Sequence, residues 1–437
     1  MAQIVKPSTL PGFMELLPKE QILFNEMMDT IRKNFEKHGF LPIDTPAIEK
    51  SEVLLAKGGG ETEKQIYRFT KGDTDMSLRF DLTVPLARYT VEHFNDLSFP
   101  FRRYHIGKVY RGEKAQKGRF REFYQCDIDT IGNEKLDILN DAEFPVVIYH
   151  TFKDLGFDDF TIRINNRKIL KGFFESLNIL DSVDVLRAVD KIDKIGREKV
   201  KEELCDNGIE EDIAVKIIDF ILISGTNSEI FDALDRLEID NEIFNEGLSE
   251  LKQVVKYITE FAVPEKNFTV DLKIARGLDY YTGTVYETTL DNYSNVGSVC
   301  SGGRFDNLAS YYTDKKLPGV GLSIGLSRLF YQLNEAKIIE AKKKSLIDLI
   351  VIPMTGFVDE AIKLVSKLRD GGINTIIYTE DAKIAKKFKY ANALEVPYTL
   401  VVGENEVKTE KYALKDMVTG NQEELSLSEI ISRIKEN

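Results

Sequence analysis

Cysteine is scarce in this chain of 437 residues. The three cysteines are Cys126, Cys205 and Cys300. They lie far apart and form no C-x-x-C pair, which argues against both a zinc site and a disulfide framework. The four histidines show no H-x-x-x-H spacing either. We therefore predict buried thiols, structural histidines and no metal held by a dedicated protein site.

The sequence also lacks a long apolar run and an excess of basic residues. No stretch approaches the run of about 20 apolar residues that a membrane span needs. The first six residues contain no apolar signal core, so we expect a cytoplasmic protein with no membrane partner. The formal net charge of -13 argues against non-specific coating of nucleic acid. A nucleic-acid substrate held by a local basic patch remains open.

Length and periodicity predict more than one domain. Apolar spacing predicts a helix over Pro18–Lys37, and two prolines within Phe40–Pro46 suit an edge strand. Residues 168–261 have helical spacing and few glycines, and they interrupt strand-like sequence, as a helical insertion does. After a charged segment at 336–346, strands alternate with helices over 347–437, which predicts a small α/β domain.

Three runs of alternating residues predict strands that each have one polar side. The runs are Leu78–Val84, His105–Glu113 and Phe120–Thr130. Their polar sides carry Arg79, Asp81 and Thr83, then Arg111 and Glu113, then Phe123, Gln125, Asp127 and Asp129. A solvated sheet face is the commonest cause of such alternation. A binding face is the alternative, because these sides hold few of the Lys, Ser and Thr residues typical of solvated strands.

The segment between the last two strands is rich in basic residues. Arg111–Arg121 reads R-G-E-K-A-Q-K-G-R-F-R. It is either a solvated hairpin loop or a clamp for phosphate groups, since guanidinium groups bind phosphate oxygens in a two-pronged manner.

In these segments the chain resembles the catalytic domain of class II aminoacyl-tRNA synthetases. The helix and strand that end at Pro46 look like motif 1, and Phe101–Asp129 looks like motif 2. Gly319–Leu329 looks like motif 3. Two further stretches, Ala275–Glu287 and Ser301–Asp306, resemble the signatures of the histidyl-tRNA synthetase family. Arg79–Thr83 has Asp81 where many bacterial members have glutamate, which resembles the eukaryotic-like branch.

The resemblance implies a fold and a domain plan. We expect an α+β catalytic domain built on an antiparallel sheet, the class II synthetase fold, over residues 1–335. The insertion at 168–261 interrupts it, 336–346 is a linker, and 347–437 is an anticodon-binding α/β domain. Motif 1 implies a homodimer, because it pairs two copies of one surface about a two-fold axis.

The resemblance also implies a histidine–tRNA ligase, which joins histidine to ATP as histidyl-adenylate and then loads tRNA(His). Arg111 is expected at the α-phosphate and the histidine carboxylate, Arg276 on the opposite side, and Arg328 at the γ-phosphate, with Arg119 assisting. Glu113 is expected at the adenine amino group and Phe123 under its ring. Mg²⁺ is expected on the outer phosphates, with no zinc.

The same comparison implies a histidine site and a tRNA site. The segment Asp81, Leu82 and Thr83 is expected at the histidine, with Asp81 and Thr83 accepting its amino group. The expected partners of the imidazole are Gln125, Asp129, Tyr280 and Tyr281. For tRNA, the expected residues are Lys383, Lys386, Lys387 and Lys389. The alternative is a catalytically silent paralogue that acts as a regulatory or tRNA-sensing subunit.

Overall fold

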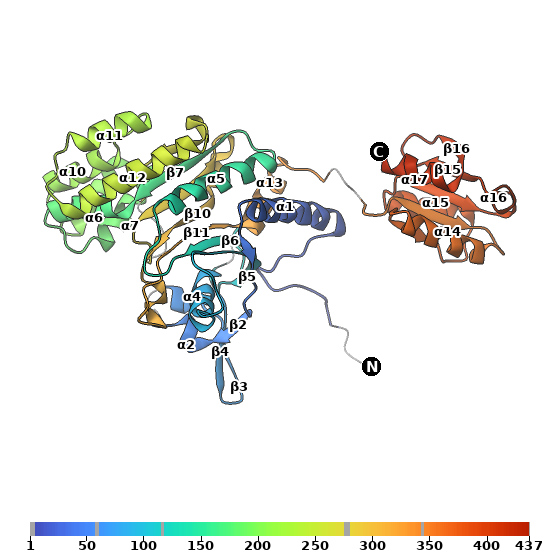
Figure 1. The fold of residues 1–437 in the computed structure, drawn as a ribbon, viewed down its shortest axis with the longest axis horizontal. Helices are drawn as coiled ribbons and strands as arrows, with labels where there is room; N and C mark the ends of the chain where they lie inside the picture. The colour runs from blue at the N-terminus through green and yellow to red at the C-terminus, as the bar shows by residue number, and fades with distance from the viewer. Residues whose placement is uncertain (1–4, 57–60, 115–117, 275–279, 342–344, 437) are drawn as a thin grey trace. The chain divides into compact units, whose positions relative to one another are not determined.

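The computed structural model describes residues 5–436 except for 57–60, 115–117, 275–279 and 342–344 (Figure 1). Contacts between Cα atoms divide the chain into two units. One contains Met1–Met14 and Met27–Ile338, and the other contains Glu15–Glu26 and Ile339–Asn437. Each unit is described by itself.

An eight-stranded sheet forms the centre of the first unit, in the order β1-β5-β6-β11-β10-β9-β7-β8. The inner strands pair antiparallel, whereas the outer pairs β1–β5 and β7–β8 are parallel. The strands are β1 (Leu41–Pro42), β5 (Phe101–Tyr110), β6 (Glu122–Ile131), β7 (Phe160–Asn166), β8 (Phe268–Val270), β9 (Thr284–Leu290), β10 (Ser298–Phe305) and β11 (Gly319–Ile324). Because β1 lies at the end of this order, its proline occupies an edge, as expected from the sequence.

Two helices contact the sheet: α5 (Leu139–Asp154), and α1 (Pro18–Lys37) through the part that belongs to this unit, where the Phe35 ring lies 6.2 Å from the Tyr104 ring of β5. The predicted helix over Pro18–Lys37 has these same bounds. The Phe40 and Phe144 rings meet edge to face with centroids 5.9 Å apart. The Tyr286 hydroxyl of β9 donates to the Asp141 carbonyl of α5 at 2.7 Å. Side chains of even number on β9 therefore face the helices, and their neighbours face the other side.

A small subdomain precedes β5 and contains a three-stranded sheet in the order β2-β4-β3. Its elements are β2 (Ile48–Lys50), α2 (Ser51–Leu54), α3 (Glu61–Gln65), β3 (Arg68–Lys71), β4 (Thr74–Leu78) and α4 (Thr83–Glu92). The predicted strand over Leu78–Val84 is wrong, since β4 ends at Leu78 and α4 begins at Thr83. Asp81 Oδ1 accepts from the Val84 amide at 3.0 Å and so supports the helix start. Side chains on both sides of this segment are buried, so the alternation of apolar and polar residues does not indicate that one side faces solvent.

The other two predicted strands are present in the structure. The strand begun at His105 belongs to β5, which ends at Tyr110, so Arg111 and Glu113 follow the strand and do not lie on it. The strand over Phe120–Thr130 is β6. The basic segment therefore connects two paired antiparallel strands, with residues 115–117 outside the described part.

Residues 168–261 form helices, which lie at one end of the sheet (Figure 1). These are α6 (Arg167–Ser176), α7 (Val183–Val189), α8 (Ile192–Ile195), α9 (Arg197–Asp206), α10 (Glu211–Ile221), α11 (Asn227–Asp235) and α12 (Glu242–Glu260). Gly172 of α6 lets the backbone of α12 approach closely, because a Cβ there would lie 2.4 Å from the Phe244 nitrogen. The first unit ends with α13 (Leu326–Glu335).

The second unit contains a five-stranded sheet in the order β13-β12-β14-β15-β16. Its elements are β12 (Leu349–Pro353), α14 (Val358–Asp370), β13 (Thr375–Ile377), α15 (Ile384–Ala393), β14 (Tyr398–Val402), α16 (Glu404–Thr409), β15 (Tyr412–Asp416), β16 (Gln422–Leu425) and α17 (Leu427–Lys435). β12 is parallel to β13 and β14, and every residue of β12 is buried. The sequence analysis missed β15, β16 and α16, because α16 and β16 are mostly exposed and the short strand β15 buries only Leu414.

Candidate active site

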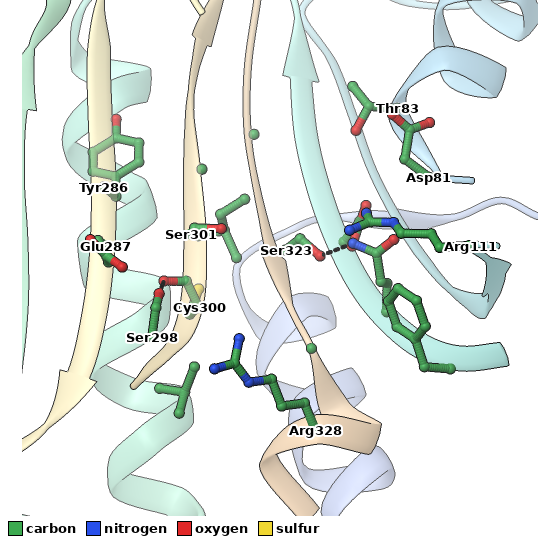
Figure 2. A pocket seen from close by; sticks show the side chains of 18 of the residues that line it. Asp81, Thr83, Arg111, Tyr286, Glu287, Ser298, Cys300, Ser301, Ser323 and Arg328 are labelled. Carbon is green, nitrogen blue, oxygen red and sulfur yellow. Dashed lines mark hydrogen bonds between the residues drawn. The ribbon is translucent and has the colours of Figure 1, made fainter. Parts of the chain in front are cut away.

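A cavity of about 520 Å³ opens on the face of the large sheet that points away from α5. Its walls come from β6, β9, β10 and β11 and from the segment before α4 (Figure 2). Tyr280 and Tyr281 also line it. The residues predicted for substrate binding that line it are Asp81, Thr83, Arg111, Glu113, Arg119, Phe123, Gln125, Asp129, Tyr280, Tyr281 and Arg328. Segments distant in the sequence therefore meet in one cavity.

Strand register explains why polar residues meet on this face. Asp127 on β6 pairs with Ser323 on β11, Ser323 pairs with Ser301 on β10, and Ser301 pairs with Glu287 on β9. Directly paired residues project from the same face of a sheet, so these four form one row across the cavity. In the next row, Asp129 lies over Gly321, where a Cβ would come within 1.9 Å of its Oδ1.

One end of the cavity is acidic. Asp81, Asp127 and Asp129 all line it, and each is at most 3% exposed. Burial raises the pKa of Asp127 to about 6, although Arg103 opposes the rise. Burial also raises the pKa of Asp81 and that of Asp129 above the ordinary range, against the opposing effects of nearby groups. Three carboxylates are thus held where water solvates them poorly.

Arg103 is the counterion within this acidic end. It is fully buried on β5, directly opposite Asp129 in the register of β6. Its Nη2 lies 2.5 Å from Asp129 Oδ2, and the same nitrogen donates to the Leu82 carbonyl at 3.1 Å. Among the described residues, its Nε and Nη1 have no hydrogen-bond partner. Arg103 therefore balances one of the three carboxylates and ties β6 to the segment before α4.

Several buried acceptors of the acidic end also lack a donor within the described part of the chain. These atoms are Asp81 Oδ2, Gln125 Oε1, Asp127 Oδ1 and Asp129 Oδ2, the last of which has only its ion pair with Arg103. The Gln125 amide group donates through Nε2 to the Ser323 hydroxyl at 2.6 Å, a contact drawn in Figure 2. Most buried polar groups in proteins have partners, so a cluster of open acceptors beside a cavity indicates a ligand that supplies donors.

Aromatic side chains close the acidic end. The Tyr280 and Tyr281 rings meet edge to face with centroids 5.0 Å apart, and Tyr280 makes a similar contact with Phe305 at 5.8 Å. Burial raises the pKa of both tyrosines, and the neighbouring carboxylates add to the rise, so both hydroxyls keep their protons. The Tyr281 ring lies against Gly303, where a Cβ would come within 3.0 Å of it.

The guanidinium groups of Arg111, Arg119 and Arg328 line the other side of the cavity. Arg111 donates through Nε to the Phe80 carbonyl at 3.1 Å, and its charged group lies 5.2 Å from the centre of the Phe123 ring. Arg119 is exposed, with Nη1 3.7 Å from Glu113 Oε2. The half-buried Arg328, on α13, donates to the Val296 carbonyl at 3.3 Å and points towards the sheet (Figure 2). Burial and the nearby Arg119 lower the pKa of Arg328, which indicates a position where an anion is favoured.

Some predicted site residues lie elsewhere. Leu82 is fully buried and does not line the cavity, although its carbonyl accepts from Arg103. Arg276 lies outside the described residues. Lys383, Lys386, Lys387 and Lys389 belong to the second unit, where Lys387 donates to the Pro353 carbonyl at 2.9 Å and the other three are exposed.

Cavity residues that the sequence analysis did not assign to a role include Asp127, Glu287, Ser301 and Ser323, and Arg103 lies beside the cavity against Asp129. Asp127 shares its side of β6 with Gln125 and Asp129, so strand alternation alone could have added it. Arg103, Ser301 and Ser323 require the register of three neighbouring strands, which no local pattern gives.

The sequence analysis also made predictions about metal binding, thiols and membrane spans. Across the ranges that the structure describes, no cluster of His, Cys, Asp and Glu side chains is arranged to hold a metal ion. Cys126 and Cys300 are buried and Cys205 is partly exposed, so the prediction of buried thiols is wrong for Cys205. Within the same ranges, no helix has the length and apolar character needed to cross a membrane.

Comparison with known proteins links this geometry to one family. Residues 12–329 match the model of the family described as histidyl-tRNA synthetase, and residues 348–437 match that of an anticodon binding domain. The histidine–tRNA ligase of Clostridium tetani is 64% identical over 433 residues, covering 99% of both chains. That of Finegoldia magna is 50% identical, covering 99% of this chain and 100% of its own. These relatives are bacterial, although Asp81 suggested a eukaryotic-like branch.

Solved structures agree with these relatives. The crystal structure of histidyl-tRNA synthetase from Nostoc sp. PCC 7120 has a TM-score of 0.91 at 41% identity, and the alignment covers 99% of this chain and 100% of that one. A Bacillus halodurans protein described as an ATP phosphoribosyltransferase regulatory subunit/histidyl-tRNA synthetase shares the fold, with a TM-score of 0.74 at 19% identity. The antiparallel sheet with its helices is accordingly the class II synthetase fold, joined to a C-terminal anticodon-binding domain.

Proposed function

This chain belongs to the histidyl-tRNA synthetase family and is an aminoacyl-tRNA ligase, and we propose that its cavity joins L-histidine to ATP before transfer to tRNA(His). The observation that carries the proposal is the division of one cavity into an acidic end and an arginine-rich side. Such a cavity matches a substrate pair with an ammonium group at one end and phosphates at the other. Its chemistry is the attack of the histidine carboxylate on the α-phosphorus of ATP, with release of pyrophosphate.

In this proposal, histidine occupies the acidic end. Asp81 and Thr83 accept the amino group, with Leu82 contributing only through its backbone. Gln125, Asp129, Tyr280 and Tyr281 surround the imidazole. Support comes from the buried open acceptors and from the protonated tyrosine hydroxyls. An amino acid without matching donors would leave these buried groups unpaired, which is a strong basis for selectivity.

ATP occupies the arginine-rich side. Arg111 holds the α-phosphate and the histidine carboxylate, and Arg328, assisted by Arg119, holds the γ-phosphate. Glu113 accepts from the adenine amino group, and Phe123 stacks under the ring. These fixed cations stabilise the negative charge that grows on the α-phosphate in the transition state. Mg²⁺ arrives with the outer phosphates of ATP as part of the substrate.

Arg276 completes the proposed site on the far side of the α-phosphate. It lies outside the described residues, so its role depends on the resemblance of Ala275–Glu287 to the histidine signature. In this role it supplies a second guanidinium group to the charge developing on the phosphate, in addition to that of Arg111.

The division of labour along the chain follows from the same family. We assign catalysis to residues 1–335, interrupted by the helical insertion at 168–261, and anticodon binding to 347–437 beyond a linker at 336–346. Lys383, Lys386, Lys387 and Lys389 form the tentative tRNA contact. We further propose a cytoplasmic homodimer, whose mass in solution would be twice the 49.8 kDa of one chain.

Histidine-dependent exchange of labelled pyrophosphate into ATP tests the activation step directly. The purified full-length chain is expected to catalyse exchange with histidine and not with other amino acids, and then to charge tRNA(His). A folded chain that binds tRNA but gives no exchange at any histidine concentration would instead support the silent, tRNA-sensing alternative. Nothing in the comparisons favours that alternative.

A further inference from the structure

The basic segment Arg111–Arg121 brings two of the proposed ATP contacts to the cavity. Its described parts are residues 111–114 and 118–121. Glu113 and Arg119 line the cavity from these parts, and Arg119 is exposed. Neither residue belongs to a helix or strand of the first unit. Sheet pairing therefore does not fix their positions, and contacts with other segments have to do so.

The later part of the basic segment packs against α13. The Phe120 and Tyr331 rings meet edge to face with centroids 5.3 Å apart. A Cβ at Gly118 would lie 3.3 Å from Nε2 of Gln332, so the backbone approaches the helix closely there. Because α13 also carries Arg328, these contacts hold the later part of the segment beside one of the cavity arginines.

A turn near the N-terminus contacts the same segment from another direction. The Phe13 amide donates to the Leu10 carbonyl at 3.1 Å, which closes the turn. The Gly12 carbonyl within it accepts from two successive amides, those of Arg121 at 2.8 Å and Glu122 at 3.4 Å. The turn is thereby bound to the point where the basic segment enters β6.

Glycine at position 12 permits this contact. Gly12 has a φ of +87°, a conformation that residues with a Cβ rarely adopt. A Cβ there would lie 2.9 Å from Cγ of Arg121 and 3.2 Å from its Cβ and Cδ. The aliphatic part of Arg121 therefore lies directly across the glycine, and any larger residue would have to displace it.

Arg121 extends this contact to Glu113. Its Nε donates to the Glu113 carbonyl at 3.0 Å, and its own carbonyl accepts from the Arg111 amide at 2.9 Å. Arg121 does not line the cavity. The turn thus orients the Arg121 side chain, and the Arg121 side chain holds the backbone of Glu113.

We propose that Gly12 and Arg121 position Glu113 for nucleotide recognition, so that the N-terminal turn Leu10–Phe13 is part of the apparatus that selects ATP. Arg121 is a positioning residue in this assignment, because it acts through the backbone of Glu113. The assignment rests on the proposed function, which places Glu113 at the adenine amino group. Its effect should appear in the use of ATP and not in the binding of histidine, because the acidic end is built from other segments.

A nucleotide without the adenine amino group tests this positioning role. Purine riboside triphosphate lacks that group, and the ratio of kcat/KM for ATP to kcat/KM for the analogue measures its recognition in pyrophosphate exchange. Arg121→Met keeps a side chain of similar length but removes the Nε donor. The ratio should fall about threefold to tenfold, the size expected for one hydrogen bond. The KM for ATP should rise, and the KM for histidine should stay unchanged.

Gly12→Ala tests the turn, with Gly156→Ala as its matched control. Gly156 has a similar φ of +90°, but a Cβ there would meet no atom within 4 Å. Both variants therefore place alanine in the same unfavourable backbone conformation, and only Gly12→Ala also displaces Arg121. Gly12→Ala should lower the nucleotide ratio as Arg121→Met does, whereas Gly156→Ala should leave it unchanged. This pair also serves if Arg121→Met does not fold.

Lys108→Met controls for the loss of a positive charge near the segment. Lys108 lies on β5, pairs with Glu122 at 2.8 Å and does not line the cavity. It neighbours Arg121 through Glu122 without holding Glu113. Its replacement should leave the nucleotide ratio and both KM values unchanged.

The outcomes separate this inference from the proposed function. A wild type without histidine-dependent exchange would overturn the proposed function itself. An active wild type whose Arg121→Met and Gly12→Ala variants lose equal activity with ATP and with the analogue would show a merely structural role, and would overturn the inference. A histidine KM that rises as much as the ATP KM would overturn it as well.

Discussion

Two buried arginine–aspartate pairs lie in the large sheet and differ in how completely they are satisfied. Arg304 on β10 donates to both oxygens of Asp141 on α5, at 3.0 Å and 2.5 Å, and Nη2 also donates to the Leu136 carbonyl at 3.2 Å. Arg103 and Asp129 also meet at 2.5 Å, but Arg103 leaves Nε and Nη1 without partners in the described part of the chain. The two pairs share chemistry and burial.

The difference separates a structural pair from a functional one. The Arg304–Asp141 pair is complete within the chain and joins a strand to the helix behind it. The Arg103–Asp129 pair borders the cavity beside acceptors that lack donors, so it belongs to a site that a ligand completes. Breaking the first pair should cost stability, whereas changing the residues of the cavity should cost activity and can even increase stability.

The largest effect is expected from Arg304→Met. Asp141 would be left buried and charged without a partner, which costs about 3–5 kcal/mol of the free energy of unfolding. Denaturation by urea, followed by circular dichroism, measures it. The double variant Arg304→Met with Asp141→Leu should recover much of the loss, because it removes the unpaired charge. A loss below about 1 kcal/mol in the single variant would contradict the structural assignment.

A comparable loss in the rate of histidine activation is expected from Arg111→Ala. If Arg111 stabilises charge on the α-phosphate, its removal should lower the rate of adenylate formation by about a hundredfold to a thousandfold. Stability should change little, since the side-chain hydrogen bond that Arg111 makes within the described residues goes to the neutral Phe80 carbonyl. Arg111→Lys should restore little, because a point charge does not reproduce a two-pronged donor. Single-turnover kinetics that show a raised KM alone would reduce Arg111 to a binding residue.

A smaller effect, of opposite sign, is expected from Asp127→Asn on the unliganded protein. Because the pKa of Asp127 is raised in the folded state to about 6, its ionised form opposes folding. This cost is absent below about pH 4 and complete above about pH 6. The variant should therefore be more stable than the wild type by about 3 kcal/mol at pH 7.5 and equally stable at pH 4. Urea denaturation at both pH values measures the difference, and a uniform change at both would exclude titration as its cause.

The sequence predicted much of the fold, because its local signals agreed with the tertiary structure. Pro18 and Gly39 bracket α1, and the alternation in Phe120–Thr130 identified β6 and its polar side. The same argument failed for Leu78–Val84, where both sides are buried and alternation carries no information. The hairpin of β15 and β16 buries only Leu414, so its two short strands gave too little apolar pattern to detect.

The sequence predicted only those residues of the candidate site that belong to a motif or to an alternating strand. Eleven of the predicted residues line one cavity, but their roles stay predictions. Arg103 became visible only through strand pairing, because it lies on β5 and acts on Asp129 of β6. Ser323 likewise acts through Gln125, which is 198 residues away in sequence. Such partners depend on register, which the local sequence does not specify.

The smallest effects are expected from two neighbouring lysines of α15, which differ, like the two arginine–aspartate pairs, in whether the side chain already has a partner within the protein. Lys387 donates to the Pro353 carbonyl and lies 5.4 Å from the centre of the Tyr378 ring, whereas Lys386 is exposed. Lys386→Ala should therefore raise the KM for tRNA a few-fold and lower the salt dependence of tRNA binding by about one counterion. Lys387→Ala should leave that slope unchanged and destabilise the second unit by about 1 kcal/mol. Pyrophosphate exchange should be normal in both. Filter binding at several salt concentrations decides: an altered slope for Lys387→Ala alone would mean that the satisfied lysine, and not the exposed one, faces the RNA.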